Sequence, residues 1–168
     1  MNTQFTITIA GQDHPQLVSQ LAATTHKLGG KWLVSKISRL DQQLVGIIKI
    51  EIPVASADQL KQELKALKEF HVRIVENTEP ASQSKREQIT LKVESTDRLG
   101  IVNDISHILD NIGINIIQIE NHRVALADLG RTVFFAELAV DMPAEVSIEQ
   151  LVEAVQQVEE NMRVEVIS

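Results

Sequence analysis

The chain has 168 residues, of which 43% are hydrophobic and 23% are charged, and its formal net charge at pH 7 is −7. This length holds one domain or two small ones, and the apolar content favours a packed core over disorder. The acidic charge argues against binding to nucleic-acid phosphates, and the absence of cysteine excludes disulfides, thiolate metal sites and cysteine nucleophiles. Because no apolar run approaches the ~20 residues of a membrane span and the first residues do not resemble a signal peptide, we expect a cytoplasmic protein that does not span a membrane.

The first half of the chain predicts four strands and two helices. Apolar and polar residues alternate in the expected strands, whereas apolar residues recur every three or four positions in the expected helices. The first helix is expected to end at Gly29, and the second is expected to start after Ser56, which is a good helix cap. The expected strands cover residues 5–10, 31–40, 44–52 and 71–75.

The second half repeats this pattern. A shift of residues 5–34 by 84 positions places strand on strand and helix on helix, with identical residues at Thr6, Asp13, Val18 and Gly29. The second helix of this copy is expected to start after Ser147. The expected strands cover residues 89–94, 115–124, 132–142 and 162–167.

The copies differ in length, and a polar segment separates them. Ser56 and Ser147 match at an offset of 91, so the second copy holds about seven extra residues, which we place in residues 122–130. Residues 77–87 lie in a polar stretch that contains Pro80 and has no periodicity, and they are predicted to be a linker. The expected domains are therefore residues 1–76 and residues 88–168.

The order β-α-β-β-α-β predicts an α+β protein made of two ferredoxin-like units. Each unit should be a four-stranded antiparallel sheet with two helices on one face. The uncovered sheet face and the sheet edges favour pairing of the units and a homodimer. Strict alternation requires one of Phe134 and Phe135 to face outward, and Trp32 is expected in the core or at an interface.

The start of the first helix in the second copy carries the most informative motif. Asp97 precedes the helix, where an aspartate can cap the free N–H groups. Gly100 is expected inside the first turn, where glycine costs about 1 kcal/mol relative to alanine. Either close packing against a neighbouring backbone or the approach of a ligand carboxylate would require the missing side chain, and both explanations remain open.

The residues Asp97, Arg98, Leu99, Gly100, Ile101 and Val102, followed by residues 112–116 (IGINI), resemble the ACT domain family. Members of that family carry Asp or Asn, then Arg, any residue, Gly and an aliphatic pair, with a Gly-x-Asn-Ile element after the helix. The resemblance extends to both copies. It implies a small-molecule sensing module with the topology predicted above.

Two such units without an attached enzyme are similar to the glycine cleavage system transcriptional repressor group. This resemblance implies a cytoplasmic regulatory protein that lacks catalytic activity and a cofactor. It implies a small amino acid such as glycine as effector and a transcription activator as protein partner, without direct binding to nucleic acid.

A zwitterionic effector needs donors for its carboxylate and acceptors for its ammonium group. The backbone N–H groups of Gly100 and Ile101 suit the carboxylate, and Asp97 and the amide oxygen of Asn115 suit the ammonium group. Arg98 could contact the ligand or serve a surface role. In the first copy, Asp13 and His14 hold the equivalent positions of Asp97 and Arg98.

The first copy departs from the family pattern because Gln16 replaces the glycine and Lys31 replaces the asparagine. Its site is therefore expected to be altered or empty. Two other functions remain open. The chain could be a protein-interaction module that binds no ligand, or an enzyme on a ferredoxin-like scaffold, although no phosphate loop, catalytic triad order or metal-ligand cluster is present.

Overall fold

The chain folds as two compact units, Met1–Pro80 and Ala81–Ser168. The computed structural model describes residues 1–76 and 86–167. Most of the predicted linker, residues 77–85, lies outside the described residues. Its last residue, Glu87, begins the first strand of the second unit.

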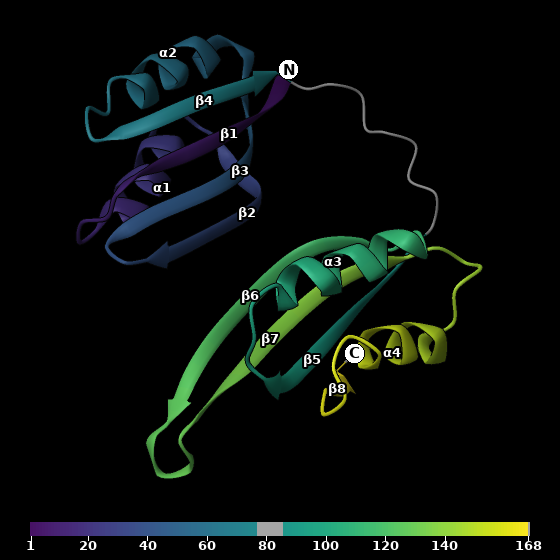
Figure 1. The fold of residues 1–168 in the computed structure, drawn as a ribbon. Coiled ribbons are helices and arrows are strands. Elements are labelled where there is room, and N and C mark those ends of the chain that lie inside the picture. The colour runs from purple at the N-terminus through teal and green to yellow at the C-terminus, as the bar shows by residue number, and fades with distance from the viewer. Residues whose placement is uncertain (77–85, 168) are drawn as a thin grey trace. The chain divides into compact units, whose positions relative to one another are not determined.

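The first unit is a four-stranded antiparallel sheet with two helices on one face (Figure 1). Its strand order is β2-β3-β1-β4, so the first and third strands of the chain lie in the centre. The predicted order β-α-β-β-α-β is confirmed. In chain order, the elements are β1 (Asn2–Gln12), α1 (Leu17–Lys27), β2 (Lys31–Leu40), β3 (Gln43–Pro53), α2 (Val54–Lys65) and β4 (Phe70–Glu76).

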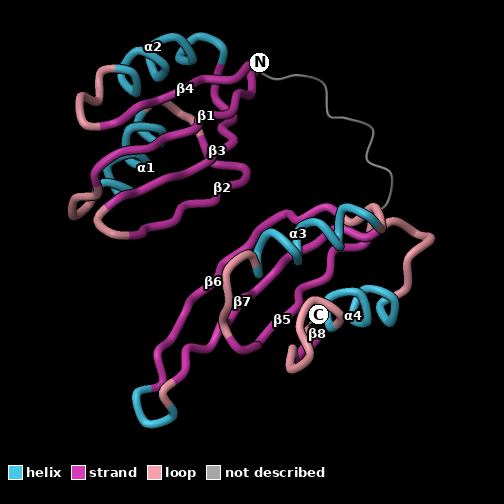
Figure 2. Tube along the Cα trace, in the orientation of Figure 1, coloured by secondary structure: helices cyan, strands magenta, loops and turns pink. Residues whose placement is uncertain are grey.

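The second unit repeats this topology, with the strand order β6-β7-β5-β8 (Figure 2). The only additional element among its described residues is a short 3-10 helix between β6 and β7. The predicted fold class is therefore confirmed for both units. In chain order, the elements are β5 (Glu87–Thr96), α3 (Ile101–Asn111), β6 (Asn115–Leu126), η1 (Ala127–Leu129), β7 (Arg131–Met142), α4 (Ile148–Gln156) and β8 (Arg163–Val166).

Each unit has its own apolar core between the sheet and the helices. In the first core, Phe5 and Ile7 of β1 pack with Leu60 of α2. In the second, Phe134 of β7 is fully buried whereas Phe135 is 38% exposed, which confirms that one of the two faces outward. Since burying one large apolar side chain contributes about 1.5–3 kcal/mol, the core of each unit stabilises that unit.

The ends of the first helices follow the sequence prediction. Gly29 and Gly113 lie just beyond α1 and α3 with φ of 81° and 76°, a left-handed conformation that favours glycine. Trp32 packs against the first core and donates a hydrogen bond of 3.1 Å from Nε1 to Oγ1 of Thr25, so its predicted core position is confirmed.

Six of the extra residues of the second unit extend the β6–β7 hairpin. The pair Leu40–Gln43 closes the hairpin of the first unit, and the equivalent pair in the second unit is Val124–Val133. Residues 125–130 are additional, which agrees with the predicted position of the longer connection. The seventh extra residue lies between β7 and α4.

The predicted start of the second helix is right in one unit and wrong in the other. Ser147 caps α4 in a reciprocal capping box with Gln150. In the first unit, however, α2 starts at Val54 with Pro53 as the N-cap residue, so Ser56 lies inside the helix. The strand β3 runs directly into this proline, whereas in the second unit a turn between Pro143 and Val146 delays the helix.

Candidate functional site

The turn before the first helix has the same attachment in both units. The backbone N–H of Asp97 donates a hydrogen bond of 3.0 Å to the carbonyl of Thr132, and that of Asp13 donates one of 2.8 Å to Gln42. Each bond joins the turn to the hairpin between the second and third strands of the unit. The backbone therefore fixes the position of both aspartates.

An arginine on the second strand pairs with each aspartate. Arg123 Nε lies 2.8 Å from Asp97 Oδ1, and Arg39 Nε lies 2.7 Å from Asp13 Oδ2. In both pairs the residues are 26 positions apart in the sequence. The Arg123 guanidinium also lies over the ring of Phe134, 5.6 Å from its centre, which adds a cation–π contact.

Neither arginine was predicted from the sequence. The signal was present, because Asp13 and Arg39 have the same spacing as Asp97 and Arg123. The aligned segment, residues 5–34, ended before it reached them. The carboxylate of Asp97 faces this arginine and does not cap the helix, so the N-cap interpretation of Asp97 is wrong.

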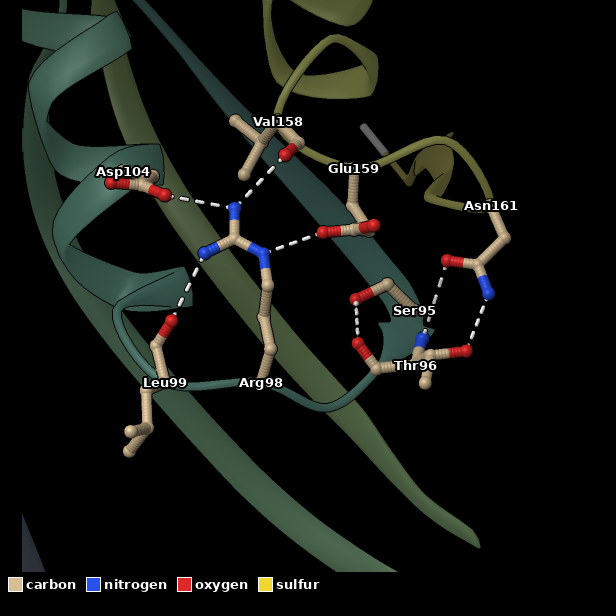
Figure 3. Close-up of polar contacts among 8 residues, drawn as sticks. All are labelled: Ser95, Thr96, Arg98, Leu99, Asp104, Val158, Glu159 and Asn161. Carbon is tan, nitrogen blue, oxygen red and sulfur yellow. Dashed lines mark hydrogen bonds and ion pairs between the residues drawn. The ribbon is translucent and has the colours of Figure 1, made fainter.

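Arg98 joins the start of α3 to the segment after α4 (Figure 3). Its Nε donates to Glu159 at 2.5 Å, and its two terminal nitrogens contact the carbonyls of Leu99 and Val158 at 3.0 Å each. Asp104 completes the arrangement at 2.8 Å from the same guanidinium. Every nitrogen of this side chain therefore has a partner within the unit.

These contacts change the acidity of both partners. Hydrogen bonds to Glu159 and then to Asp104 raise the pKa of Arg98 above its ordinary value. The hydrogen bond from Arg98 lowers the pKa of Asp104 below its ordinary value. Each charge stabilises the other, so Arg98 acts in the structure as a connection between two elements.

Asn161 ties the end of β5 to the same segment (Figure 3). Its side chain hydrogen-bonds to the Thr96 hydroxyl and accepts from the Thr96 backbone N–H at 3.4 Å. Arg98 and Asn161 thus fix both sides of the turn that contains Asp97.

His14 makes weaker contacts at the position equivalent to Arg98. Its Nε2 lies 3.9 Å from a carboxylate oxygen of Glu69, and its ring lies 6.3 Å from the ring of Phe70 in an edge arrangement. Glu69 and Phe70 follow α2, just as Glu159 follows α4. The first unit therefore has a looser version of the same connection.

Gly100 lies immediately before α3 as its N-cap residue, and not inside the first turn as the sequence suggested. Its φ is 79°, and a side chain at this position would meet only Arg98, at 3.9 Å. Close packing is therefore not the reason for the glycine, because the left-handed backbone already accounts for it. Gln16 adopts the same conformation before α1, with φ of 70°, and its side chain is exposed.

The N-terminal ends of α1 and α3 share a second property. Neither helix has a side-chain cap, whereas Ser147 caps α4. The first N–H groups of an uncapped helix carry a partial positive charge and can donate to an anion. In α3 this end adjoins the turn that holds Asp97 and Arg98.

The remaining predicted site residues lie in very different surroundings. Leu99 is 95% exposed, whereas the side chain of Ile101 is fully buried in the core, so Ile101 could offer a ligand only its backbone. Asn115 pairs with Asp141 at one end of β7, while Thr96, next to Asp97, pairs with Val133 near the other end. Eight residues of β7 separate these pairs, about 27 Å at ~3.3–3.4 Å per residue.

Asp97 and Asn115 of one unit therefore do not contact the same small ligand. Among the described residues, two surface hollows have volumes of about 680 and 530 Å³. The larger lies on the sheet face opposite the helices, and the smaller adjoins Thr96 and Asn161. Neither is lined by Asp97, Gly100 or Asn115.

Residues 1–76 and 86–167 contain no cluster of three or more histidine and acidic side chains that could hold a metal ion. No helix within these ranges has the length and apolar character needed to cross a membrane.

Comparison with known proteins finds a family match within the first unit. Residues 3–75 match the family model of the ACT domain. The match falls on the first copy, in which Gln16 stands at the position of Gly100. The second copy has the same strand topology as the first. No curated protein sequence matches the chain.

Two solved structures resemble the chain over its whole length. A protein of unknown function from Galdieria sulphuraria is 20% identical with a TM-score of 0.86, covering 99% of this chain and 98% of that one. A candidate glycine cleavage system transcriptional repressor is 14% identical with a TM-score of 0.68, covering 100% and 99% of the two chains. At these identities the likeness establishes the tandem fold.

Proposed function

Since residues 3–75 match the ACT domain model and the second unit repeats the fold of the first, we propose that the chain is a regulatory protein that senses a small amino acid. We further propose that it controls transcription in the cytoplasm through contact with a transcription activator. The whole-length likeness to the candidate glycine cleavage repressor supports this direction and makes glycine the first effector to test.

The observation that carries the proposal is the uncapped start of α3 beside the Asp97–Arg123 pair. The N–H groups of Gly100 and Ile101 would receive the effector carboxylate, and Asp97 would receive its ammonium group. A zwitterion carries a negative and a positive charge in a small volume. The start of α3 offers the complementary pair, because the partial positive charge of the helix end lies near the Asp97 carboxylate.

The ligand must compete with Arg123 for Asp97, because Arg123 Nε lies 2.8 Å from Asp97 Oδ1. The Asp97 side chain is only 19% exposed, so the ammonium group would have to approach along its open edge. Glycine has about five heavy atoms, and a ceiling of roughly 1.5 kcal/mol per atom limits the binding free energy to about −7.5 kcal/mol. The proposed affinity therefore lies between micromolar and millimolar.

Calorimetric titration with glycine, serine and alanine tests this function. The wild-type chain should bind at least one of them, and Asp97→Asn should abolish the heat because a neutral amide cannot pair with an ammonium group. Asp13→Asn is the matched control in the other unit. Wild-type and Asp97→Asn proteins with the same heats would reject the site.

One observation favours a second function, that of an interaction module that binds no ligand. Asp97 and Arg98 both have partners within the unit, so the charged groups of the motif are already satisfied. Capture of the activator that is unaffected by any amino acid would favour this function over sensing.

We also propose that the chain acts as a homodimer. Asn115 can meet Asp97 across a shared ligand only if the two residues come from two copies of the chain, because about 27 Å separates their positions along one sheet. Analytical ultracentrifugation in the presence and absence of glycine tests this state.

A further inference from the structure

Each sheet has a second face, which the helices of its own unit leave uncovered (Figure 1). Alternate residues of a strand point to opposite faces, so the register identifies the side chains on this side. In the first unit, one row across the sheet is Lys36, Ile47, Thr8 and Arg73. The next row holds Val34, Lys49, Thr6 and Val75.

This surface of the first unit, called the basic face below, combines apolar and cationic side chains. Val34, Val45 and Ile47 are 57%, 52% and 54% exposed on the neighbouring strands β2 and β3. Isolated exposed aliphatic side chains are ordinary, but three on adjacent strands form a patch that another surface could cover.

Three cations lie on the same face, Lys36 and Lys49 beside the patch and Arg73 two strands away. Lys36, Lys49 and Arg73 have no ion-pair partner among the described residues, and no carboxylate lies between them. Glu51, at the rim, is already paired with Lys31 at 3.4 Å. With neutral histidine, the basic face has a net charge of +3.

The corresponding surface of the second unit, called the acidic face, has the opposite charge. Glu120 on β6 lies directly opposite Glu137 on β7, a like-charge pair that is unfavourable in an isolated sheet. With the cations Lys92 and Arg163, the residues that line the hollow on this face have a net charge of −2. Its carboxylates are those of Glu94, Glu120, Glu137 and Glu165.

The acidic face is also hollow where the basic face is apolar. The hollow of about 680 Å³ lies on it, with Phe135 and Ala136 among its lining residues. Phe135 is 38% exposed there. The aliphatic patch of the basic face offers an apolar surface that could fill this hollow, and the cations beside it could meet the surrounding carboxylates.

We propose that the basic face of one chain packs on the acidic face of a second copy, and the reverse, in a two-fold homodimer. This inference deepens the homodimer of the proposed function by assigning its surfaces. Face-to-face sheets pack about 10 Å apart, which brings these side chains into contact.

The expected buried area favours two reciprocal contacts. A face four strands wide and about five residues long covers roughly 300 Å², given strand spacings near 4.8 Å and a rise near 3.4 Å. One pair of faces then buries about 600 Å², and two pairs bury about 1,200 Å², where the range of stable interfaces begins. A closed two-fold dimer uses both faces of both copies and leaves none exposed.

Charge reversal with rescue tests the proposal on the full chain. The wild-type mass from light scattering should be twice the 18.7 kDa of one chain and should fall as salt is added. Lys36→Glu with Lys49→Glu should weaken the dimer at least roughly tenfold, and Glu94→Lys with Glu137→Lys should do the same. All four substitutions in one chain should restore the dimer, since each pair of faces regains opposite charges.

Controls separate this result from unfolding and from the proposed function. Lys65→Glu with Glu153→Lys reverses charges on the helical side and should leave the dimer intact, and circular dichroism should show every variant to be folded. A wild-type chain that light scattering shows to be monomeric overturns the proposal. The two faces would then pair within one chain or be covered by another protein. If the charge-reversed variants remain dimeric, the assigned surfaces are wrong. That result does not affect the proposed amino-acid sensing, which the calorimetric titration with glycine tests separately.

Discussion

Arg123 donates to the carboxylate of Asp97 at 2.8 Å, and the same bond recurs between Arg39 and Asp13 at 2.7 Å. Each pair joins the turn before the first helix to the second strand of its unit. Gln16 and Gly100 at the nearby helix starts differ, so the ion pair is retained where the helix-start glycine is not. This retention is expected if the pair holds the turn in place in both units.

Replacing Arg123 with Gln should loosen the turn of the second unit. An ion pair with a half-exposed arginine contributes about 0.2–1 kcal/mol, and the contact over Phe134 adds about 0.5–1 kcal/mol. We expect a loss of about 1 kcal/mol and faster hydrogen exchange at Asp97 and Arg98. Arg131→Gln, on the adjacent strand, is the control, and equal exchange in both variants would contradict the assigned role.

The residues before α1 and α3 both have a left-handed backbone, so adding a side chain at one and removing it at the other should change stability in opposite directions. Gly100→Ala should destabilise the second unit by about 1 kcal/mol, because a left-handed backbone costs a residue with a Cβ about 1–2 kcal/mol. Gln16→Gly should stabilise the first unit by a few tenths to about 1 kcal/mol through relief of the same strain. Calorimetric unfolding measures both, and a destabilised Gln16→Gly protein would show that position 16 is not strained.

The different starts of the second helices provide another matched pair. Ser147→Ala removes the capping box of α4 and should cost about 1 kcal/mol. Ser56→Ala should be neutral or slightly stabilising, because Ser56 lies inside α2 and makes no cap there. Urea unfolding of both variants distinguishes them. An equal loss in the two variants would mean that α2 begins later than Val54.

The contact between Arg98 and Asp104 predicts a dependence of stability on acid. The Arg98 hydrogen bond lowers the pKa of Asp104 in the folded chain below the ordinary value of 3.8, so the folded state binds this proton less readily than the unfolded state. The stabilisation is therefore complete above this ordinary value and is lost as pH falls through the lower folded pKa.

Wild-type protein should accordingly exceed Asp104→Asn in stability at neutral pH, and the difference should shrink as pH falls below about 4. Urea unfolding across this range measures the difference. Asp128→Asn, in the hairpin of the second unit, controls for general charge removal. A constant difference between wild type and Asp104→Asn at all pH values would mean that the ion pair does not contribute.

The fold could be predicted because the apolar positions in the sequence are the positions that are buried in the structure. The alternation in β1 and β5 and the glycines after α1 and α3 were sufficient for the repeated topology. The start of α2 could not be predicted in the same way. It depends on where β3 ends, because the last residue of this strand, Pro53, is also the N-cap residue of the helix.

The candidate site was predicted less well, for reasons of geometry. Asp97 and Asn115 are separated in the sequence mainly by α3, and a helix of 11 residues carries the chain about 16 Å along its axis. They consequently reach opposite ends of the sheet. Arg123 is 26 positions from Asp97 and meets it because β6 runs beside β7 to the end of the sheet at which β5 leads into Asp97.

NMR titration of the backbone amides of Gly100 and Ile101 with glycine tests whether the start of α3 receives a small zwitterion. Binding at this position predicts saturable shifts of these two signals, with a dissociation constant between micromolar and millimolar and without comparable shifts in the Asp97→Asn variant. Unchanged signals at Gly100 and Ile101, with glycine or any other small amino acid in excess, would contradict it.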